Sequence, residues 1–598
     1  MMQQQSYTDS IHYYFADFIC NKYNCNSEVV KALLFCVSYM TSYGHSCLSL
    51  ATIAHKKLDE IVFEDYTSIP ELTFPDVTSL HTVLMECHAV KADDDDAIKP
   101  IVYDNGNCYL YRYFNYEEII AQWFLNSISK SHEIDMQQVN AVLETFEQKG
   151  MHFASLQKIA QLAALHHTFC VISGGPGTGK TTTVAGIVYQ LLTAHNTLSI
   201  ALCAPTGKAA SRLKESMKQF KDKYCDDAIK DIFPVESSTI HRLLGYKKGA
   251  LEFYYNEDNR LPYDVVIVDE SSMVDIALLA KLIKALKEGA RFIVVGDKDQ
   301  LSSVEAGAFF GDLCWGVTQF GYTSQWNKTV AAIKDDDAQQ LPSHPVRDAI
   351  VVLSKAYRFG ADSGIAVLAQ AVRDADMHKV DNVLKNSYND VEFIQYSSID
   401  EIHTIIKEYA KQHYESVAIA HNVSDAFSKI SHQCIVTPFN QGPWGVSTLN
   451  AIIEKQINPL ASGWYHGKII MVTANDYNLQ LFNGDMGIFV NNDDGESGVC
   501  FPLEDSYRKI NPLLLSEYIP AYTITIHKSQ GSEFNTVIVV LPNDINSRWS
   551  MLLTRELLYT AITRAKEKLI IYGTHDVIAY MVNNPTKRAS GIQGKVWQ

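Results

Sequence analysis

Several features are missing from this sequence of 598 residues, and each absence narrows what the chain can be. No run of about twenty apolar residues occurs, so we expect no membrane span. The first ten residues, MMQQQSYTDS, have neither a basic start nor an apolar stretch, which argues against a secretory signal. We therefore expect a cytoplasmic protein.

Paired cysteines and an excess of positive charge are also missing. The twelve cysteines are scattered and none forms a C-x-x-C pair, so the sequence predicts buried reduced thiols rather than a zinc site. The net charge of −17 argues against a surface that coats duplex DNA. It leaves room for a narrow channel that holds one strand, and it fits a subunit that docks on a more basic partner.

The sequence does contain a phosphate-binding loop at residues 171–182, VISGGPGTGKTT. An apolar run at 169–172 predicts a buried strand before it, and residues 181–192 predict an amphipathic helix after it. Backbone N–H groups of such a loop surround a polyphosphate, with Lys180 on the β- and γ-phosphates and the Thr181 hydroxyl on magnesium. The predicted nucleotide-binding residues are Gly174, Gly175, Pro176, Gly177, Thr178, Gly179, Lys180, Thr181 and Thr182.

The length allows about three to five domains. We predict an α/β chain with a small α+β docking domain at 1–115 and two parallel-sheet cores at 116–345 and 346–598. A polar hairpin at about 246–262 interrupts the first core. Short strands separated by Gly and Asn at about 443–518 predict a β-rich insertion in the second core, shaped as a small barrel.

Local patterns place the remaining elements. Helices are expected at 11–18 and 29–40, and a hairpin around Asn105-Gly106. Residues 316–345 are expected to be irregular. The acidic runs Asp93–Asp96 and Asp335–Asp337 are charge runs, the first expected in a solvated loop. Further strands are expected at 198–203, 263–268, 291–296, 351–353, 416–420, 433–437, 522–527, 537–541 and 568–572.

Polar residues that follow the predicted strands carry the expected chemistry. Asp269 and Glu270 end one strand, where they can hold magnesium and polarise a water. Gln300 follows another strand and is placed to sense the γ-phosphate. Gln157, one helix before the phosphate loop, can read an adenine edge with its amide. Arg564, on a helix predicted over 558–565, can neutralise a transferring phosphoryl group.

Other residues are candidates for contact with a nucleic-acid backbone, or with phosphate. Small residues at a strand end suit close approach to a phosphodiester, although an ordinary strand-to-helix turn is an equal alternative. For any single arginine, Arg358 included, a surface salt bridge is the alternative. The DNA-contact candidates are Pro205, Thr206, Lys208, His241, Thr525, His527 and Ser529.

Taken together, these segments resemble a superfamily 1 helicase of the RecD type. The ordered motifs are GGPGTGKTT, APTGKAA, VDESSM, GDKDQL, YRF, IHKSQGSEF and YTAITRAK, and the match covers about residues 150–575. The resemblance implies two RecA-like cores that hold ATP and Mg²⁺ between them, an SH3-like insertion, and 5′-to-3′ translocation on single-stranded DNA. It also implies that Arg358 and Arg564 meet the γ-phosphate and that Gln300 couples hydrolysis to DNA.

The first 115 residues separate two subtypes. They show no helix-hairpin-helix repeats of the kind that free-standing RecD-like helicases carry. CLSL and PIVYDNGNCYLYRYFNYE are similar to the alpha subunit of exodeoxyribonuclease V, which implies a heterotrimer with RecB-like and RecC-like partners acting on single strands at duplex ends. No carboxylate cluster of a nuclease is found. A free-standing helicase and a nucleotide-regulated structural subunit remain alternatives.

Overall fold

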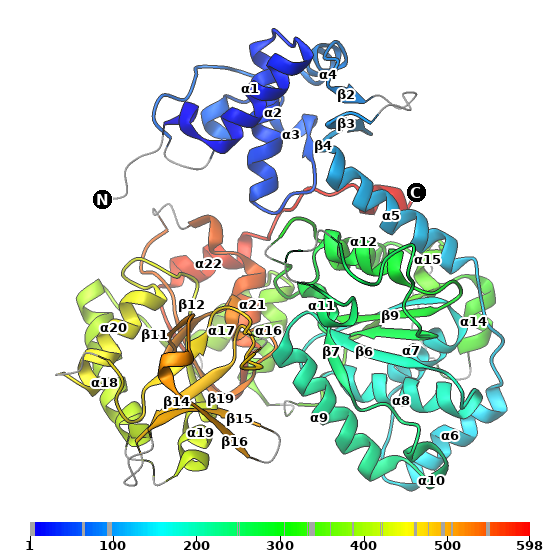
Figure 1. Cartoon of the computed structure of the whole chain (residues 1–598), viewed down its shortest axis with the longest axis vertical. Coiled ribbons are helices and arrows are strands. Elements are labelled where there is room, and N and C mark those ends of the chain that lie inside the picture. Colours follow the sequence, from blue (N-terminus) through cyan, green and yellow to red (C-terminus); the bar gives the residue numbers. More distant parts are fainter. Residues whose placement is uncertain are drawn as a thin grey trace.

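The computed structural model shows a small N-terminal part above two α/β cores that lie side by side (Figure 1). It describes residues 6–598 except 63–65, 92–97, 248, 250–251, 304, 332, 334–340, 359, 361, 386–387, 419, 421, 460–462, 477, 492–496, 504–505 and 546–549. The acidic runs Asp93–Asp96 and Asp335–Asp337 lie outside the described residues. Within them, no helix is both long enough and apolar enough to cross a membrane.

In the N-terminal part, helices pack on a four-stranded sheet of order β1-β4-β3-β2. Helix α1 begins where the Ser10 hydroxyl accepts a hydrogen bond from Tyr13 N, and Ser27 caps α2 in the same way. Both predicted helices and the hairpin at Asn105-Gly106 are confirmed. The elements are α1 (Ile11–Tyr23), α2 (Glu28–Ser42), β1 (Leu48–Ser49), α3 (Leu50–Ile53), α4 (Val77–Met85), β2 (Val90–Lys91), β3 (Ile101–Asp104) and β4 (Asn107–Leu110).

One prediction about cysteine is wrong in this part. Cys25 and Cys87 form a disulfide, whereas the scattered spacing predicted only reduced thiols. The two residues are 62 positions apart and follow the ends of α1 and α4, which both pack on α2 and so come together. The other described cysteines are free, and all but Cys225 are buried.

The first core is a six-stranded parallel sheet of order β10-β5-β9-β8-β6-β7. Its inner strands are buried on both faces, as continuous apolar runs in a parallel sheet require. The strands are β5 (Phe169–Gly174), β6 (Ile200–Ala204), β7 (Ser237–Thr239), β8 (Val265–Val268), β9 (Arg291–Gly296) and β10 (Ile350–Leu353). The helices are α6 (Met136–Gln148), α7 (Ser155–His166), α8 (Lys180–Ala194), α9 (Gly207–Tyr224), α10 (Asp227–Lys230), α11 (Ile240–Leu243), α12 (Ile276–Ala285), α13 (Phe309–Cys314), α14 (Ser324–Val330) and α15 (Pro345–Asp348).

Strand β10 corrects the predicted boundary between the cores. We assigned it to the second core, but its residues pair with β5 next to the phosphate loop. Two further local predictions are wrong. The described residues of 246–262 contain no strand, and residues 316–345 include the helix α14.

The second core is a five-stranded parallel sheet of order β11-β20-β19-β12-β18. The strand predicted at 416–420 is wrong, because these residues include the end of the long helix α18. The strands are β11 (Val391–Ile394), β12 (Gln433–Thr437), β18 (Thr523–Thr525), β19 (Phe534–Val540) and β20 (Ala565–Tyr572). The helices are α16 (Gly364–Arg373), α17 (Met377–Lys385), α18 (Ile399–Ala418), α19 (Val423–His432), α20 (Val446–Ile457), α21 (Arg555–Ile562) and α22 (His575–Asn583).

An antiparallel sheet of order β16-β15-β14-β13-β17 is inserted in the second core. It starts later than predicted, because residues 446–457 form helix α20. Pairing among the described residues stops at β16 and β17, so the insertion is confirmed but its closure into a barrel is not. The strands are β13 (Ile469–Val472), β14 (Met486–Val490), β15 (Gly498–Pro502), β16 (Tyr507–Ile510) and β17 (Tyr518–Pro520).

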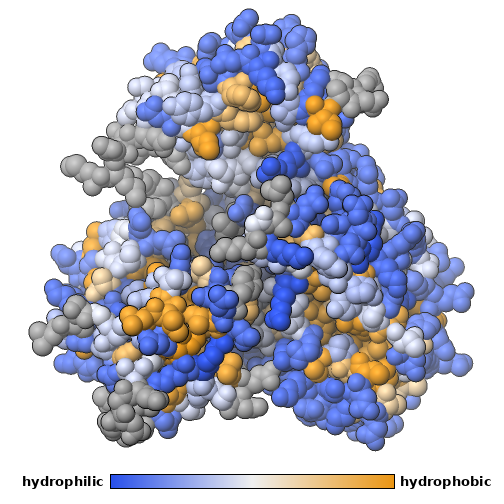
Figure 2. Space-filling view, in the orientation of Figure 1, coloured by the Kyte–Doolittle hydropathy of each residue, from blue (hydrophilic) through white to orange (hydrophobic). Residues whose placement is uncertain are grey.

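The surface over this inserted sheet is partly apolar (Figure 2). Its exposed apolar side chains include Leu513, which is 91% exposed, and Leu514, which is 59% exposed.

Two helices join the three parts. Helix α5 (Tyr111–Ile128) continues directly from β4 and packs on α12 of the first core. Helix α23 (Ile592–Val596) follows the second core, yet it also packs on α5 (Figure 1). Buried Glu117 of α5 accepts hydrogen bonds from Ser46 of the N-terminal part and from Gly591 N. The chain end therefore ties the N-terminal part to the first core.

Candidate functional site

The phosphate loop connects β5 to α8 in a form that only glycine adopts without strain. Gly177 and Gly179 have φ values of +76° and +80°. A side chain at Gly179 would collide with the Gln157 amide, and one at Gly175 would lie 2.8 Å from the Tyr559 hydroxyl. Lys180 Nζ donates to the carbonyls of Gly174 at 2.7 Å and Gly175 at 3.2 Å. The loop is thus a tight turn with the Lys180 ammonium group beside it, an arrangement that suits a polyphosphate.

Gln157 lies directly beneath this loop. Its Oε1 accepts from Ala154 N, and its Nε2 donates to Thr178 O at 3.0 Å. The amide therefore fixes the loop to the start of α7. Each of its two polar atoms retains a second hydrogen-bonding position, so contact with an adenine stays a prediction.

Acidic residues lie at the carboxyl ends of β9, which pairs with β5, and of β8, which pairs with β9. Burial, with help from Glu270, raises the pKa of Asp269, and Lys180 opposes the shift. Burial also raises the pKa of Asp297, again against the effect of Lys180. Asp297 was not among the predicted site residues, although its position after β9 in GDKDQL is the signal that marks it. Two carboxylates and one lysine thus share one buried site.

Glu270 has an unusual backbone. Its φ of +51° lies in the left-handed region, which costs a non-glycine residue on the order of 1 kcal/mol. This conformation starts the turn Ser271–Met273. The charge of Glu270 raises the pKa of Arg564 of the second core, so the predicted water-polarising residue and the predicted arginine interact electrostatically between the two cores.

Gln300 lies where the two cores meet. Its Nε2 donates to Asp297 Oδ2 at 3.0 Å. The next residue, Leu301, donates its N–H to Thr560 Oγ1 and accepts from Gln530 Nε2 through its carbonyl. Both partners belong to the second core, so the segment that carries Gln300 is hydrogen-bonded to that core.

The second core closes the site with α21 and the residues after it. The Tyr559 hydroxyl donates to Asp297 Oδ2 at 3.2 Å. Arg564 is 3% exposed, and its guanidinium donates to Thr560 O and Ser532 O. Arg564 does not lie on the predicted helix, because α21 ends at Ile562. Burial lowers its pKa, and Glu270 and Glu533 oppose that shift.

Arg358 follows β10 and touches the other side of the phosphate loop. Tyr357 N donates to Gly177 O at 2.8 Å, and a side chain at Gly177 would collide with Arg358. Arg358 Nη2 pairs with Glu533 Oε1 at 2.6 Å. Burial raises the pKa of Glu533, but Arg358, Arg212 and Arg564 bring it below its usual range. Arg358 thus connects the loop to the second core.

The residues predicted to contact DNA separate into two groups. Thr206 caps α9 by accepting from Ala209 N, Lys208 and Pro205 are partly exposed beside it, and burial lowers the pKa of His241 on α11. By contrast, Thr525 and Ser529 are buried, with Ser529 Oγ bonded to Ile526 O. These two hydroxyls are not presented on the surface in this structure, which does not support their predicted contact. His527 lies near Arg588, and burial lowers its pKa.

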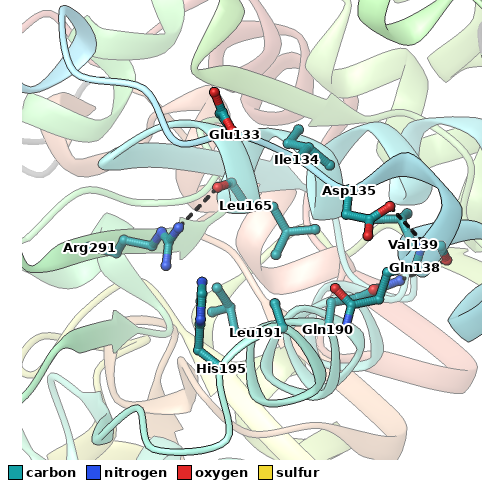
Figure 3. A pocket seen from close by; sticks show the side chains of 11 residues that line it. Glu133, Ile134, Asp135, Gln138, Val139, Leu165, Gln190, Leu191, His195 and Arg291 are labelled. Atoms are coloured by element: carbon teal, nitrogen blue, oxygen red, sulfur yellow. Dashed lines mark hydrogen bonds between the residues drawn. The ribbon is translucent and has the colours of Figure 1, made fainter.

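A small cavity elsewhere in the first core is not part of this site. It lies between the ends of α7 and α8 and the start of β9, where Arg291 Nη2 donates to Leu165 O (Figure 3). Its volume of about 30 Å³ has room for about one water molecule. A nucleotide does not fit there.

Comparison with known proteins adds three family models and several relatives. Residues 4–109 match the N-terminal domain of the RecBCD enzyme subunit RecD, residues 157–306 match an AAA domain, and residues 520–572 match the UvrD-like helicase C-terminal domain. The RecBCD enzyme subunit RecD of Haemophilus influenzae is 31% identical over 97% of this chain and 96% of its own length.

Two further likenesses are weaker. The ATP-dependent RecD2 DNA helicase of Deinococcus radiodurans is 29% identical over 71% of this chain and 49% of its own length. A solved structure of two coordinating Pif1 helicases at forked duplex DNA is 16% identical, covers 70% of this chain and 92% of its own, and has a TM-score of 0.36. At that score the structural likeness supports no conclusion.

Proposed function

Because this chain belongs to the RecD family of RecBCD enzyme subunits, we propose that it moves 5′-to-3′ along single-stranded DNA as one subunit of a helicase–nuclease complex. As a family member it is an ATP-dependent DNA helicase. The observation that carries the proposal is the junction of the two cores at the phosphate loop. Lys180, Asp269 and Asp297 form its wall in the first core, and Tyr559 and Arg564 form the facing wall in the second core.

The donor set of the first wall fits ATP with Mg²⁺. Lys180 would hold the β- and γ-phosphates, and Thr181 and Asp269 would hold the metal, which would supply positive charge opposite the transferring phosphoryl group. Glu270 would polarise the attacking water. Burial and the neighbouring Glu270 raise the pKa of Asp269, and a carboxylate with a perturbed pKa beside a phosphate loop is typical of a functional site.

The hydrogen bonds of the Gln300 segment support its coupling role. Gln300 contacts Asp297, and Leu301 contacts Thr560 and Gln530. A change of charge at the γ-phosphate would therefore reach the second core through the hydrogen bonds of Gln300 and Leu301. The proposed DNA contacts of the first core, Pro205, Thr206, Lys208 and His241, lie at the ends of the neighbouring strands β6 and β7.

The N-terminal part is proposed to dock on RecB-like and RecC-like subunits, in a heterotrimer that processes duplex ends for recombinational repair. The match of residues 4–109 supports this. So does helix α1, where Ile11, Tyr14 and Phe18 are 75%, 61% and 60% exposed. Their spacing places them on one helix face, and a row of exposed apolar side chains is typical of an interface.

The experiment compares the wild-type chain with Lys180→Gln and with Lys158→Gln as a matched control. Lys158 lies on α7 and pairs with Glu147 away from the loop. Wild type and control should hydrolyse ATP faster with single-stranded DNA and unwind a duplex with a 5′ tail but not a 3′ tail. Lys180→Gln should lose both activities while it folds normally. Unwinding from a 3′ tail would refute the polarity, and hydrolysis by Lys180→Gln would refute the lysine assignment.

A free-standing helicase is a second candidate, favoured by the likeness to RecD2. Co-expression with RecB-like and RecC-like chains, followed by size-exclusion chromatography, separates the two. A stable heterotrimer supports the subunit. A chain that elutes alone and unwinds processively supports the free-standing helicase.

A further inference from the structure

The inserted sheet contacts the first core through a turn, residues 482–485. A side chain at Gly207, the first residue of α9, would lie 3.2 Å from Phe482 Cβ. The second core meets the same helix start, since a side chain at Gly531 would lie 3.7 Å from Ala209 Cβ. Helix α9 lies on the side of the first core that faces the second (Figure 1). Three parts of the molecule therefore meet at the N-terminus of α9.

The turn is held rigidly by its own acidic residue. Asp485 Oδ2 accepts from Phe482 N at 2.7 Å, and Asp485 N donates to Phe482 O at 3.0 Å. The neighbouring N–H of Gly484 donates to Val472 O of β13. The position of the Asp485 carboxylate is thus set by the inserted sheet.

This carboxylate acts on Lys208, a proposed DNA contact. Burial raises the pKa of Asp485, and Lys208 and Arg508 oppose the shift. Burial and Arg212 lower the pKa of Lys208 to about 8, and Asp485 opposes that shift. Lys208 Nζ also lies 5.9 Å from the centre of the Phe534 ring. The turn lies against Gly207, the residue next to Lys208, so its carboxylate attracts the lysine without a direct ion pair between them. A DNA phosphate at Lys208 competes with this attraction, because both anions act on the same cation.

We propose that the 482–485 turn competes with single-stranded DNA for Lys208, with the Asp485 carboxylate attracting the lysine while the inserted sheet rests on α9. The inference rests on the proposed DNA contact of Lys208. It follows that the DNA strand and the 482–485 turn compete for Lys208. Movement of the inserted sheet away from α9 therefore increases the affinity for DNA. The turn therefore controls how strongly Lys208 binds DNA.

The test measures binding of a fluorescent oligo-dT by anisotropy with the full-length chain. Asp485→Asn keeps an acceptor for Phe482 N but removes the charge, so binding at low salt should tighten about three- to tenfold. Lys208→Gln should weaken binding and reduce the salt slope by about 0.7. In the double variant the gain from Asp485→Asn should disappear. Asp476→Asn is the matched control, since Asp476 caps Asn478 N and Leu479 N in the same insertion, and its affinity should equal that of wild type.

Unchanged or weaker binding by Asp485→Asn overturns the proposal, as does a gain that persists with Lys208→Gln. A gain of equal size in Asp476→Asn overturns it too, because it shows a general charge effect. A wild-type chain that does not bind the oligonucleotide refutes the proposed function instead.

Discussion

The two walls of the junction between the cores are built from different chemistry. The wall of the first core carries Lys180 and two carboxylates, Asp269 and Asp297, which are buried at an energetic cost. The facing wall presents hydrogen-bond donors: Tyr559, which donates to Asp297 across the junction, and the cation Arg564, which is anchored in its own core. The first wall is therefore suited to bind nucleotide and metal, and the second to respond to what is bound. Each change below should affect one of these functions and leave the other intact.

The largest expected effect comes from Arg564→Ala. If the second wall supplies charge to the transferring phosphoryl group, hydrolysis should fall about a thousandfold or more. ATP binding, measured with a fluorescent analogue, should change little because the first wall is intact. Arg555→Ala at the start of α21 is the control, since Arg555 donates to Val582 O within the second core. Loss of ATP binding together with hydrolysis would erase the difference between the walls.

A smaller effect is expected from Asp269→Asn, which should raise the free energy of unfolding while it removes activity. Folding raises the pKa of Asp269. At pH values above that pKa the buried carboxylate is charged and lowers the free energy of unfolding, and this penalty disappears as the pH falls through the pKa. Asp269→Asn should lose hydrolysis yet gain stability on the order of 1 kcal/mol near neutral pH. The gain should shrink in acid. Thermal melting at roughly pH 8 and roughly pH 5 measures this.

Asp264 at the other end of the same strand gives the matched comparison. Its hydrogen bonds from Lys287 and Ser199 lower its pKa to about 2, so its charged form stabilises the fold at neutral pH and that contribution is lost as pH falls. Asp264→Asn should therefore lower the melting temperature. If Asp269→Asn and Asp264→Asn shift the melting temperature in the same direction, the burial cost does not lie at the catalytic end of β8.

The smallest expected effect is that of Tyr559→Phe. It removes one hydrogen bond between the walls, worth about 0.5–1.5 kcal/mol, so DNA-stimulated hydrolysis should fall by about tenfold or less. Hydrolysis without DNA should change less, because the bond joins the cores rather than holding nucleotide. Tyr580→Phe in α22, which only packs on the second core, serves as control. Equal loss with and without DNA would show that Tyr559 does not couple the walls.

The first wall was predictable because its chemistry is local. A strand, a glycine loop and a helix are contiguous in sequence, and so are β8 with Asp269-Glu270 and β9 with its acidic turn. The order of strands is not contiguous. Strand β10 was placed in the wrong core because pairing with β5 depends on where the chain returns after residue 345, and nothing in its apolar composition says so.

Two other errors have physical causes. The apolar end of α18 looked like a strand, although Ile402, Ile406, Ala410 and Val417 recur at helical spacing and are buried. Asp297 and Tyr559 were missed, although Asp297 follows β9 within GDKDQL. Their pairing comes from one hydrogen bond between the two cores, and these residues are 262 positions apart. The facing wall was thus predictable only as a list of motif residues.

The central claim is that one phosphoryl group meets both walls, and a crystal structure with Mg²⁺, ADP and a γ-phosphate mimic tests it most directly. The account predicts Lys180 Nζ and the Arg564 guanidinium on opposite sides of that mimic, each at about 3 Å. Arg564 still bonded to Thr560 O and Ser532 O, with the mimic contacted by the first core alone, would contradict it.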